Sequence, residues 1–308
     1  MAPADSLPDL DDLLTKTSRT FALSIPLLPE PTRRQVGVAY LLFRIADNFE
    51  DAAEWTEEQK VSALEIFCQL LAQPSFEEAS RWAERWVAET PIDHAGYQEL
   101  LAEVPAVLTA FFDLEPRARE LVREHTVRTA EGMADVVRRT GGDGELELET
   151  LEDLRHYCYI VAGIVGEMLT ELFVLGRGEM AGIAAFLRER SREFGEGLQL
   201  VNILKDCAFD ATEGRTFLPP DVAVPDVFAL ARADLDRACE YINAMQDAGA
   251  ERGLIAFNAL NMLLAFASLD KLEREGPGSK ISREEVYEIY EDLQRTLDVN
   301  GRVQSLVA

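Results

Sequence analysis

Four polar side chains recur at helical spacing within the apolar stretch 40–51. They are Tyr40, Arg44, Asp47 and Asp51, at positions i, i+4, i+7 and i+11. This spacing places all four on one face of a helix, with Glu50 beside them. Apolar residues flank this stripe on both sides: Leu41, Leu42, Phe43, Ile45 and Phe49. A polar stripe bounded so narrowly suits a helix that lines an interior cavity.

A second stripe of the same character occupies the stretch 199–210. Its members are Gln199, Asn202, Asp206 and Asp210, at i, i+3, i+7 and i+11, and they stand among Leu198, Leu200, Val201, Ile203 and Leu204. Each stripe contains two aspartates separated by one helical turn. Taken singly, either stripe also fits the solvent-exposed face of an amphipathic helix. The narrowness of both stripes and their shared pair of aspartates favour the cavity.

The paired aspartates have the chemistry of a magnesium–diphosphate site. Mg²⁺ prefers oxygen ligands and is usually held by one or two carboxylates together with substrate phosphates and water. Two aspartate pairs on facing helices would hold a cluster of ions around a diphosphate. The ions would neutralise the leaving group, so that a carbon–oxygen bond can ionise. A calcium loop is excluded, because neither stripe has alternating Asp or Asn ligands with a central glycine.

Helical periodicity dominates the whole chain, and strand-like alternation is almost absent. Prolines and glycines separate the helical stretches. The predicted helices are 9–17, 32–53, 56–72, 116–139, 151–176, 182–205 continuing toward 210, 226–250, 253–274 and 282–299, with further helices between Pro74, Pro91, Pro105 and Pro116. No repeat or linker divides the chain. We therefore expect an all-α fold, a helical bundle with a central cavity, in one domain over residues 1–308.

The chain carries 56 acidic and 30 basic side chains, a formal net charge of −26. This charge argues against sequence-independent nucleic-acid binding, which depends on Lys and Arg meeting phosphates. Anionic lipid surfaces should also repel it. An anionic substrate must therefore be met locally, by metal ions or by a few arginines.

The four cysteines and three histidines are scattered, so they form no zinc site. Isolated cysteines suggest reduced thiols in a cytoplasm. The N-terminus lacks the apolar core of a signal peptide. The longest apolar stretch, 253–269, is shorter than the roughly 20 residues of a membrane span, and Asn258 and Asn261 interrupt it. We expect a cytoplasmic protein in which this stretch is a buried helix.

The motifs together resemble the squalene/phytoene synthase family. Ser18-Arg-Thr-Phe21 is similar to that family's opening S-R-[ST]-F, and 40–51 resembles its first aspartate motif in the squalene-type form. The stretch 157–166, YCYIVAGIVG, resembles the Y-C-x-x-V-A-G-x-V-G signature. The stretch 199–219 resembles the second aspartate motif and its G-R-x-[FY]-[LW]-P tail. The resemblances occur in family order over about residues 15–290.

The resemblance implies a role for each matching residue. Asp47, Asp51, Asp206 and Asp210 would bind Mg²⁺ and diphosphate, with Glu50 assisting, and Tyr157 would lie near a carbocation. Residues implied to contact or enclose the substrate are Ser18, Arg19, Phe21, Tyr40, Arg44, Val161, Ala162, Gly166, Gln199, Asn202 and Arg215.

The sequence departs from the family pattern in the second motif. The acid that relatives usually carry before the last aspartate is replaced by Phe209, which leaves that metal site one oxygen poorer. Lys205 stands where arginine is common.

Gly163 and Gly166 lie one turn apart inside the signature. Glycine inside a helix costs up to about 1 kcal/mol relative to alanine. Two explanations stand: close helix packing, or a smooth wall for a prenyl chain.

The resemblance implies a head-to-head condensation of two isoprenoid diphosphates through a cyclopropyl diphosphate. We expect two farnesyl diphosphates to give squalene, with Mg²⁺ and with NADPH as reductant. Candidate cofactor contacts are Asn258, Asn261, Lys280 and Arg283. The alternatives are a phytoene or dehydrosqualene synthase, which loses a proton without reduction, and a non-catalytic interaction protein. A head-to-tail prenyltransferase or terpene cyclase usually has D-D-x-x-D, which is absent. A lipid-like product also implies transient membrane contact.

Overall fold

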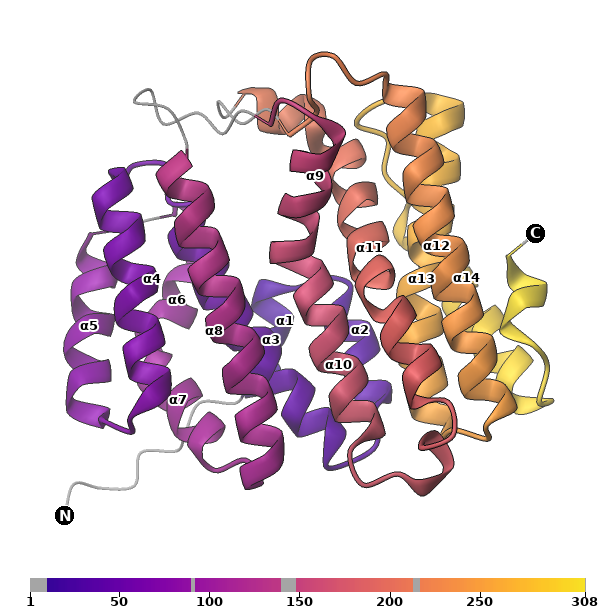
Figure 1. The fold of residues 1–308 in the computed structure, drawn as a ribbon, viewed down its shortest axis with the longest axis horizontal. Coiled ribbons are helices and arrows are strands. Elements are labelled where there is room, and N and C mark those ends of the chain that lie inside the picture. The colour runs from indigo at the N-terminus through magenta and orange to yellow at the C-terminus, as the bar shows by residue number, and fades with distance from the viewer. Residues whose placement is uncertain (1–9, 90–91, 140–147, 213–216, 308) are drawn as a thin grey trace. The chain divides into compact units, whose positions relative to one another are not determined.

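The computed structural model describes residues 10–89, 92–139, 148–212 and 217–307, with the side chains of 208–212 left outside the description. Every regular element among them is a helix (Figure 1). This confirms the predicted all-α class. Contacts group the chain into two compact units, residues 1–25 with 30–139 and residues 26–29 with 140–308. The single domain over 1–308 stays a prediction, and each unit is described by itself.

The first unit is built around α3. Its helices are α1 (Leu10–Thr17), α2 (Phe21–Ser24), α3 (Thr32–Glu50), α4 (Glu57–Ala72), α5 (Phe76–Ala88), α6 (Ala95–Ala102), α7 (Val104–Phe112) and α8 (Pro116–Arg139). The short turn η1 (Ile25–Leu27) follows α2 where the chain passes from residues of the first unit to residues 26–29 of the second. Helix α3 contacts α1, α4, α6, α7 and α8. Phe49 of α3 meets the rings of Trp55, Phe67 and Trp86. The apolar positions around the first stripe therefore form the core of this unit.

The second unit is built around α11. Its elements are α9 (Leu151–Cys158), the π-helical turn η2 (Tyr159–Gly163), α10 (Ile164–Val174), η3 (Gly178–Met180), α11 (Ala184–Thr212), α12 (Val224–Asp247), α13 (Arg252–Glu275), α14 (Arg283–Asp298) and η4 (Val303–Leu306). Helix α11 contacts α9, η2, α10, α12 and α13 (Figure 1).

Side-chain caps begin several of the helices. Thr56, Thr150 and Ser282 form capping boxes at the starts of α4, α9 and α14. Each hydroxyl accepts from a backbone N–H that the helix leaves unpaired, while the side chain three positions later accepts from the cap's own N–H. These caps place the helix starts within one or two residues of the predicted ones.

Two stretches, Leu151–Val174 and Arg252–Glu275, are long and apolar enough to cross a membrane by length and composition. In the fold, 78% of the apolar window in α13 is buried, against 50% in the first stretch. The burial of α13 agrees with the predicted buried helix at 253–269.

The predicted helix 151–176 is interrupted by η2. A π turn adds one residue to a helical turn, and such turns are frequent at functional sites. Because the apolar pattern continues through it, periodicity alone predicted one continuous helix.

Two glycines bring α10 and α11 into backbone contact. A Cβ on Gly166 would overlap the carbonyl oxygen of Ser191, and one on Gly195 would overlap that of Ala162. Close helix packing therefore accounts for Gly166. Its predicted contact with substrate stays a prediction.

We predict that Gly166→Ala destabilises the fold by about 2 kcal/mol or more. The added methyl group must push two backbones apart, and this cost outweighs the helix propensity gained. Urea unfolding followed by circular dichroism measures the change. Gly182→Ala is the matched control, because no heavy atom lies within 4 Å of its added Cβ. Equal stability of the two variants would contradict the interpretation.

A cluster of ionic side chains is buried where α9, α11 and α12 meet. Glu196 of α11 is fully buried, and Asp234 of α12 is 3% exposed. Arg155 of α9 donates to Glu196 at 2.8 Å and lies 3.6 Å from Asp234. The Oδ2 of Asp234 has no hydrogen-bond partner among the described atoms. Burial raises the pKa of Asp234 to about 7, partly opposed by Arg155 and reinforced by Glu196 and Glu193.

We predict that the effect of Asp234→Asn on stability, relative to the wild type, is more favourable at pH 8 than at pH 5. The folded state holds a proton on Asp234 between about pH 4 and pH 7, where the unfolded chain has released it. The free energy of unfolding of the wild type therefore falls by roughly 2 to 4 kcal/mol as pH rises through that window. The variant has no such loss, so the difference in Tm, variant minus wild type, should increase from pH 5 to pH 8. A difference independent of pH would refute the assignment.

Candidate functional site

The first stripe forms a half-exposed band on α3. Tyr40, Arg44, Asp47 and Glu50 of this helix and the capping residue Asp51 are all partly exposed. The other residues from 41 to 49 are buried. The sequence pattern of a narrow polar stripe between apolar flanks is thus reproduced within the first unit.

Arg44 is the centre of the contacts within this band. Its Nη1 lies 3.2 Å from Oδ2 of Asp47, and its Nε donates to the hydroxyl of Tyr40 at 3.4 Å. The guanidinium also lies 5.4 Å from the ring centroid of Tyr97. Tyr97, on α6, was not predicted, because a lone tyrosine on another helix gives no signal in the sequence.

Ionisation of the Asp47 carboxyl is electrostatically unfavourable. Burial raises the pKa of its carboxyl to about 6; Arg44 opposes this rise, and Asp51 adds to it. Two carboxylates one turn apart, with limited access to water, favour a bound cation. The donor set therefore fits Mg²⁺, which asks for one or two carboxylates from a helix and takes its remaining oxygens from substrate and water.

The predicted N-terminal residues meet the same band. The Ser18 hydroxyl accepts from the backbone N–H of Phe21, the first residue of the short helix α2, at 2.9 Å. The Phe21 ring lies 5.5 Å from that of Tyr40. Tyr40 donates its hydroxyl to the carbonyl of Thr17 at 2.8 Å. Arg19 is exposed. Ser18, Phe21, Tyr40, Arg44 and Asp47 are thereby connected in the first unit.

The second stripe lies on α11 in the second unit. Gln199 and Asp206 are half-buried and Asn202 is exposed, while Leu200, Val201, Ile203 and Leu204 are buried. The side chains of Phe209 and Asp210 and the whole of Arg215 lie outside the described residues. Their predicted roles stay predictions.

Two lysines contact Asp206. Lys280, between α13 and α14, lies 3.0 Å from its Oδ1, and Lys205 lies 3.3 Å from its Oδ2. Lys205 also donates to the amide oxygen of Asn202 at 2.8 Å. Lys280 is thus found on a predicted metal ligand, although the sequence suggested that it meets cofactor phosphates. Arg283, at the start of α14, is exposed.

The signature segment 157–166 contacts the tail of the second aspartate motif through aromatic rings. Tyr157 is 5% exposed, and its ring lies 5.0 Å from that of Phe217. Val161 and Ala162 are half-buried members of the π turn. Asn258 and Asn261 are buried in α13, where each amide donates to the carbonyl four residues earlier, Leu254 and Phe257. These bonds account for both amides locally, and their contact with a cofactor stays a prediction.

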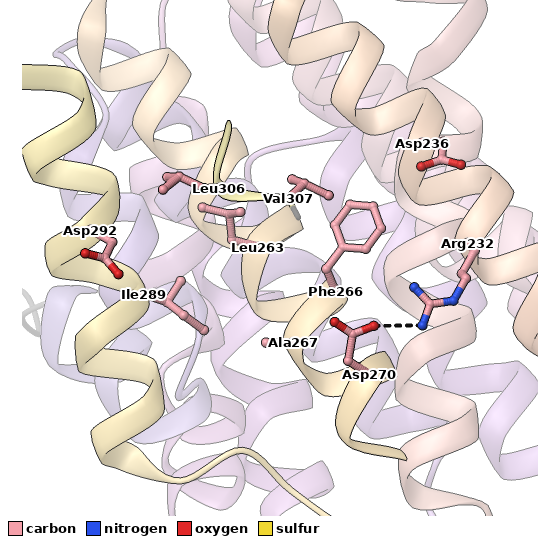
Figure 2. A pocket seen from close by; sticks show the side chains of 10 residues that line it. All are labelled: Arg232, Asp236, Leu263, Phe266, Ala267, Asp270, Ile289, Asp292, Leu306 and Val307. Atoms are coloured by element: carbon pink, nitrogen blue, oxygen red, sulfur yellow. Dashed lines mark hydrogen bonds and ion pairs between the residues drawn. The ribbon is translucent and has the colours of Figure 1, made fainter. Parts of the chain in front are cut away.

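The second unit also has a cavity of about 390 Å³ away from the stripe (Figure 2). Its apolar floor comes from α13, α14 and the end of the chain, including Phe266, Ile289 and Leu306. Arg232 at its edge is paired with Asp270 at 2.7 Å. None of the predicted site residues lines this cavity.

The similarity of this chain to known proteins extends over the residues described above. The family model for squalene/phytoene synthases matches residues 14–224. The squalene synthase of Eremothecium gossypii is 32% identical over 212 residues, which cover 68% of this chain and 45% of that protein. The squalene synthase ERG9 of Saccharomyces cerevisiae is 31% identical over 212 residues, with the same coverage. The match thus spans less than half the length of these relatives.

Among solved structures, that of TcSQS in complex with the ligand BPH1237 has the same fold. The TM-score is 0.71 over 97% of this chain and 95% of that chain, at 22% sequence identity. The family-model match extends from the end of α1 to the start of α12 and contains both aspartate stripes and the 157–166 signature. The chain therefore belongs to the squalene/phytoene synthase family.

Proposed function

We propose that this protein condenses two farnesyl diphosphates head to head, through a cyclopropyl diphosphate, to squalene. The observation that carries the proposal is the arrangement on α3, where Asp47 and Asp51 share a face with Arg44. A carboxylate pair that needs a cation, next to a guanidinium, is a combination suited to a metal-bound diphosphate. Membership of the family and the squalene synthases among its relatives support the same reaction class.

Each polar group of the stripes has a defined task in this proposal. Asp47, Asp51, Asp206 and Asp210 hold Mg²⁺, with Glu50 assisting. The metal, when bound, offsets the charge of the departing diphosphate. Arg44 contacts the same group and keeps its charge at every physiological pH. Tyr40, Gln199 and Asn202 orient the substrate.

The carbocation formed when diphosphate leaves must be kept from water. Tyr157 suits a place beside the cation, because its ring is buried against Phe217 and an aromatic face attracts positive charge. Val161 and Ala162 contribute apolar surface in the same segment.

The reductant is NADPH, with Arg283 and Lys280 meeting its phosphates. We expect the enzyme in the cytoplasm, and its hydrocarbon product would require transient contact with a membrane.

We predict that Asp47→Ala or Asp206→Ala abolishes turnover of farnesyl diphosphate while helix content stays native. Each change removes one of the carboxylates proposed to hold Mg²⁺, and excess EDTA should have the same effect on the wild type. Diphosphate release and circular dichroism are the measurements. Glu54→Ala, at an exposed acid just after the first stripe, is the control and should remain active. Full activity of the wild type in excess EDTA would disprove the metal requirement.

We predict that squalene forms from farnesyl diphosphate only when NADPH is present. The hydride must reach a cation that water does not reach, so the nicotinamide must share the cavity with the prenyl chains. Product analysis by gas chromatography, with and without NADPH, makes the measurement, and geranylgeranyl diphosphate serves as the alternative substrate. Equal yields of dehydrosqualene or phytoene in both conditions, with no squalene, would assign the enzyme to the proton-loss branch.

A further inference from the structure

Glu196 is a fully buried carboxylate to which the proposed reaction gives no task. It lies on α11, one turn before Gln199 and three turns before Asp206. A buried charge is tolerated only when it is paired and hydrogen-bonded. Two arginines meet this need: Arg155 of α9 donates to one oxygen at 2.8 Å, and Arg192, one turn earlier on α11, donates to the other.

The partners of Glu196 enclose the π turn from both ends. Arg155 precedes the turn, and the guanidinium of Arg192 lies over the ring of Tyr159, its first residue, at 4.5 Å. At its last residue, Gly163, an added Cβ would lie 3.4 Å from Cγ of Glu196 and 3.5 Å from Cγ of Arg192. Residues 155, 159 and 163 are spaced four apart, so this face of the segment rests on the Glu196–Arg192 pair.

The contact between this segment and α11 sets the relative positions of the proposed catalytic groups in the second unit. Tyr157 stands between Arg155 and the turn, while Val161 and Ala162 are inside the turn. Gln199, Asn202 and Asp206 are on α11. A π turn is a rare conformation that persists where its surroundings favour it, and no other ion pair among the described residues joins α9 or η2 to α11.

We propose that Glu196 is a positioning residue, which uses Arg155 and Arg192 to hold the π turn, and with it Tyr157, in register with the second aspartate stripe. The inference rests on the proposed function for its catalytic consequence. Asp234 and Glu193 belong to the same cluster, but they lie outside this contact. No described hydrogen bond joins either of them to a residue of the π turn. The clamp is therefore Glu196 with its two arginines.

The test replaces Glu196 by glutamine, which has the same shape. The side-chain oxygen of the glutamine can still accept from one arginine. The NH₂ group of the glutamine then faces the other arginine, so that two hydrogen-bond donors oppose each other. We expect amide hydrogen exchange in the peptide covering 157–166 to quicken at least about tenfold, with the rest of the protein unchanged. We also expect kcat for farnesyl diphosphate to fall about tenfold or more, with KM within about threefold, because substrate binding by the stripes remains.

Glu240→Gln is the matched control. It removes an ion pair of α11 with α12, in which Arg190 lies 2.7 Å from Glu240, and this pair does not touch the π turn. Exchange at 157–166 and kcat should both stay at wild-type values. If Glu196→Gln does not fold, Arg155→Met gives a second test, because it removes the donor from α9, whose side chain is 32% exposed, and leaves Arg192 on Glu196. It also removes the 3.6 Å ion pair of Arg155 with Asp234, which lies outside the π turn.

The outcomes separate this inference from the proposed function. Unchanged exchange at 157–166 in the Glu196 and Arg155 variants would overturn the clamp. Faster exchange with unchanged kcat would show that the clamp has no positioning role. A wild-type protein that releases no diphosphate from farnesyl diphosphate would refute the proposed function, and the exchange measurement would still decide the clamp.

Discussion

Asp47 shares a face of α3 with Asp51, and only part of its carboxylate meets water. Burial raises its pKa to about 6, so its negative charge is held at a cost near neutral pH. A helix with leucine, isoleucine and phenylalanine on its other faces cannot turn this side chain elsewhere without exposing its core. Among the described residues, Arg44 offsets this cost at 3.2 Å from Asp47, and a divalent cation would offset it further. The proposed affinity of the site for cations would thus follow from the packing of α3.

The same constraint shapes the second unit, where it is resolved differently. Glu196 lies deeper than Asp47 and receives two arginines, which complete its hydrogen bonding without a ligand. Asp234 has a more distant arginine and an unpartnered oxygen, and it takes up a proton near neutral pH instead. The glycines of α10 and α11 belong to this arrangement, because only bare backbones allow the helices to approach until Arg155 reaches across to Glu196. Carboxylates that are buried and paired hold the fold, whereas the half-exposed carboxylates of the two stripes keep a face that a metal could reach.

The sequence could predict what depends on local pattern. Periodicity predicted the long helices to within a few residues, and the spacing of polar residues predicted both stripes. It did not predict the π turn, because one inserted residue in an apolar stretch leaves the pattern almost unchanged. Nor did it predict Tyr97 beside Arg44 or Arg155 beside Glu196, since these contacts join helices that are distant in sequence. The glycines of the signature suggested close packing as one explanation, but the backbone oxygen that Gly166 meets, that of Ser191, belongs to another helix.

In the proposed function, Lys280 has two roles that cannot be filled at the same time: it pairs with Asp206 in the structure, and it is proposed to meet a cofactor phosphate. A lysine that neutralises Asp206 cannot at the same time meet a cofactor phosphate. The pair is weak, because Lys280 is 58% exposed and exposed ion pairs contribute about 1 kcal/mol or less. A divalent ion carries twice the charge and binds the carboxylate directly, so it outcompetes the ammonium group for Asp206. Once Asp206 holds a metal, the attraction that keeps Lys280 there is lost, and its long side chain is free to follow the nearest phosphate. In the proposed reaction, the basic residue after the most apolar helix would therefore serve a cofactor best once the diphosphate and its metal are in place.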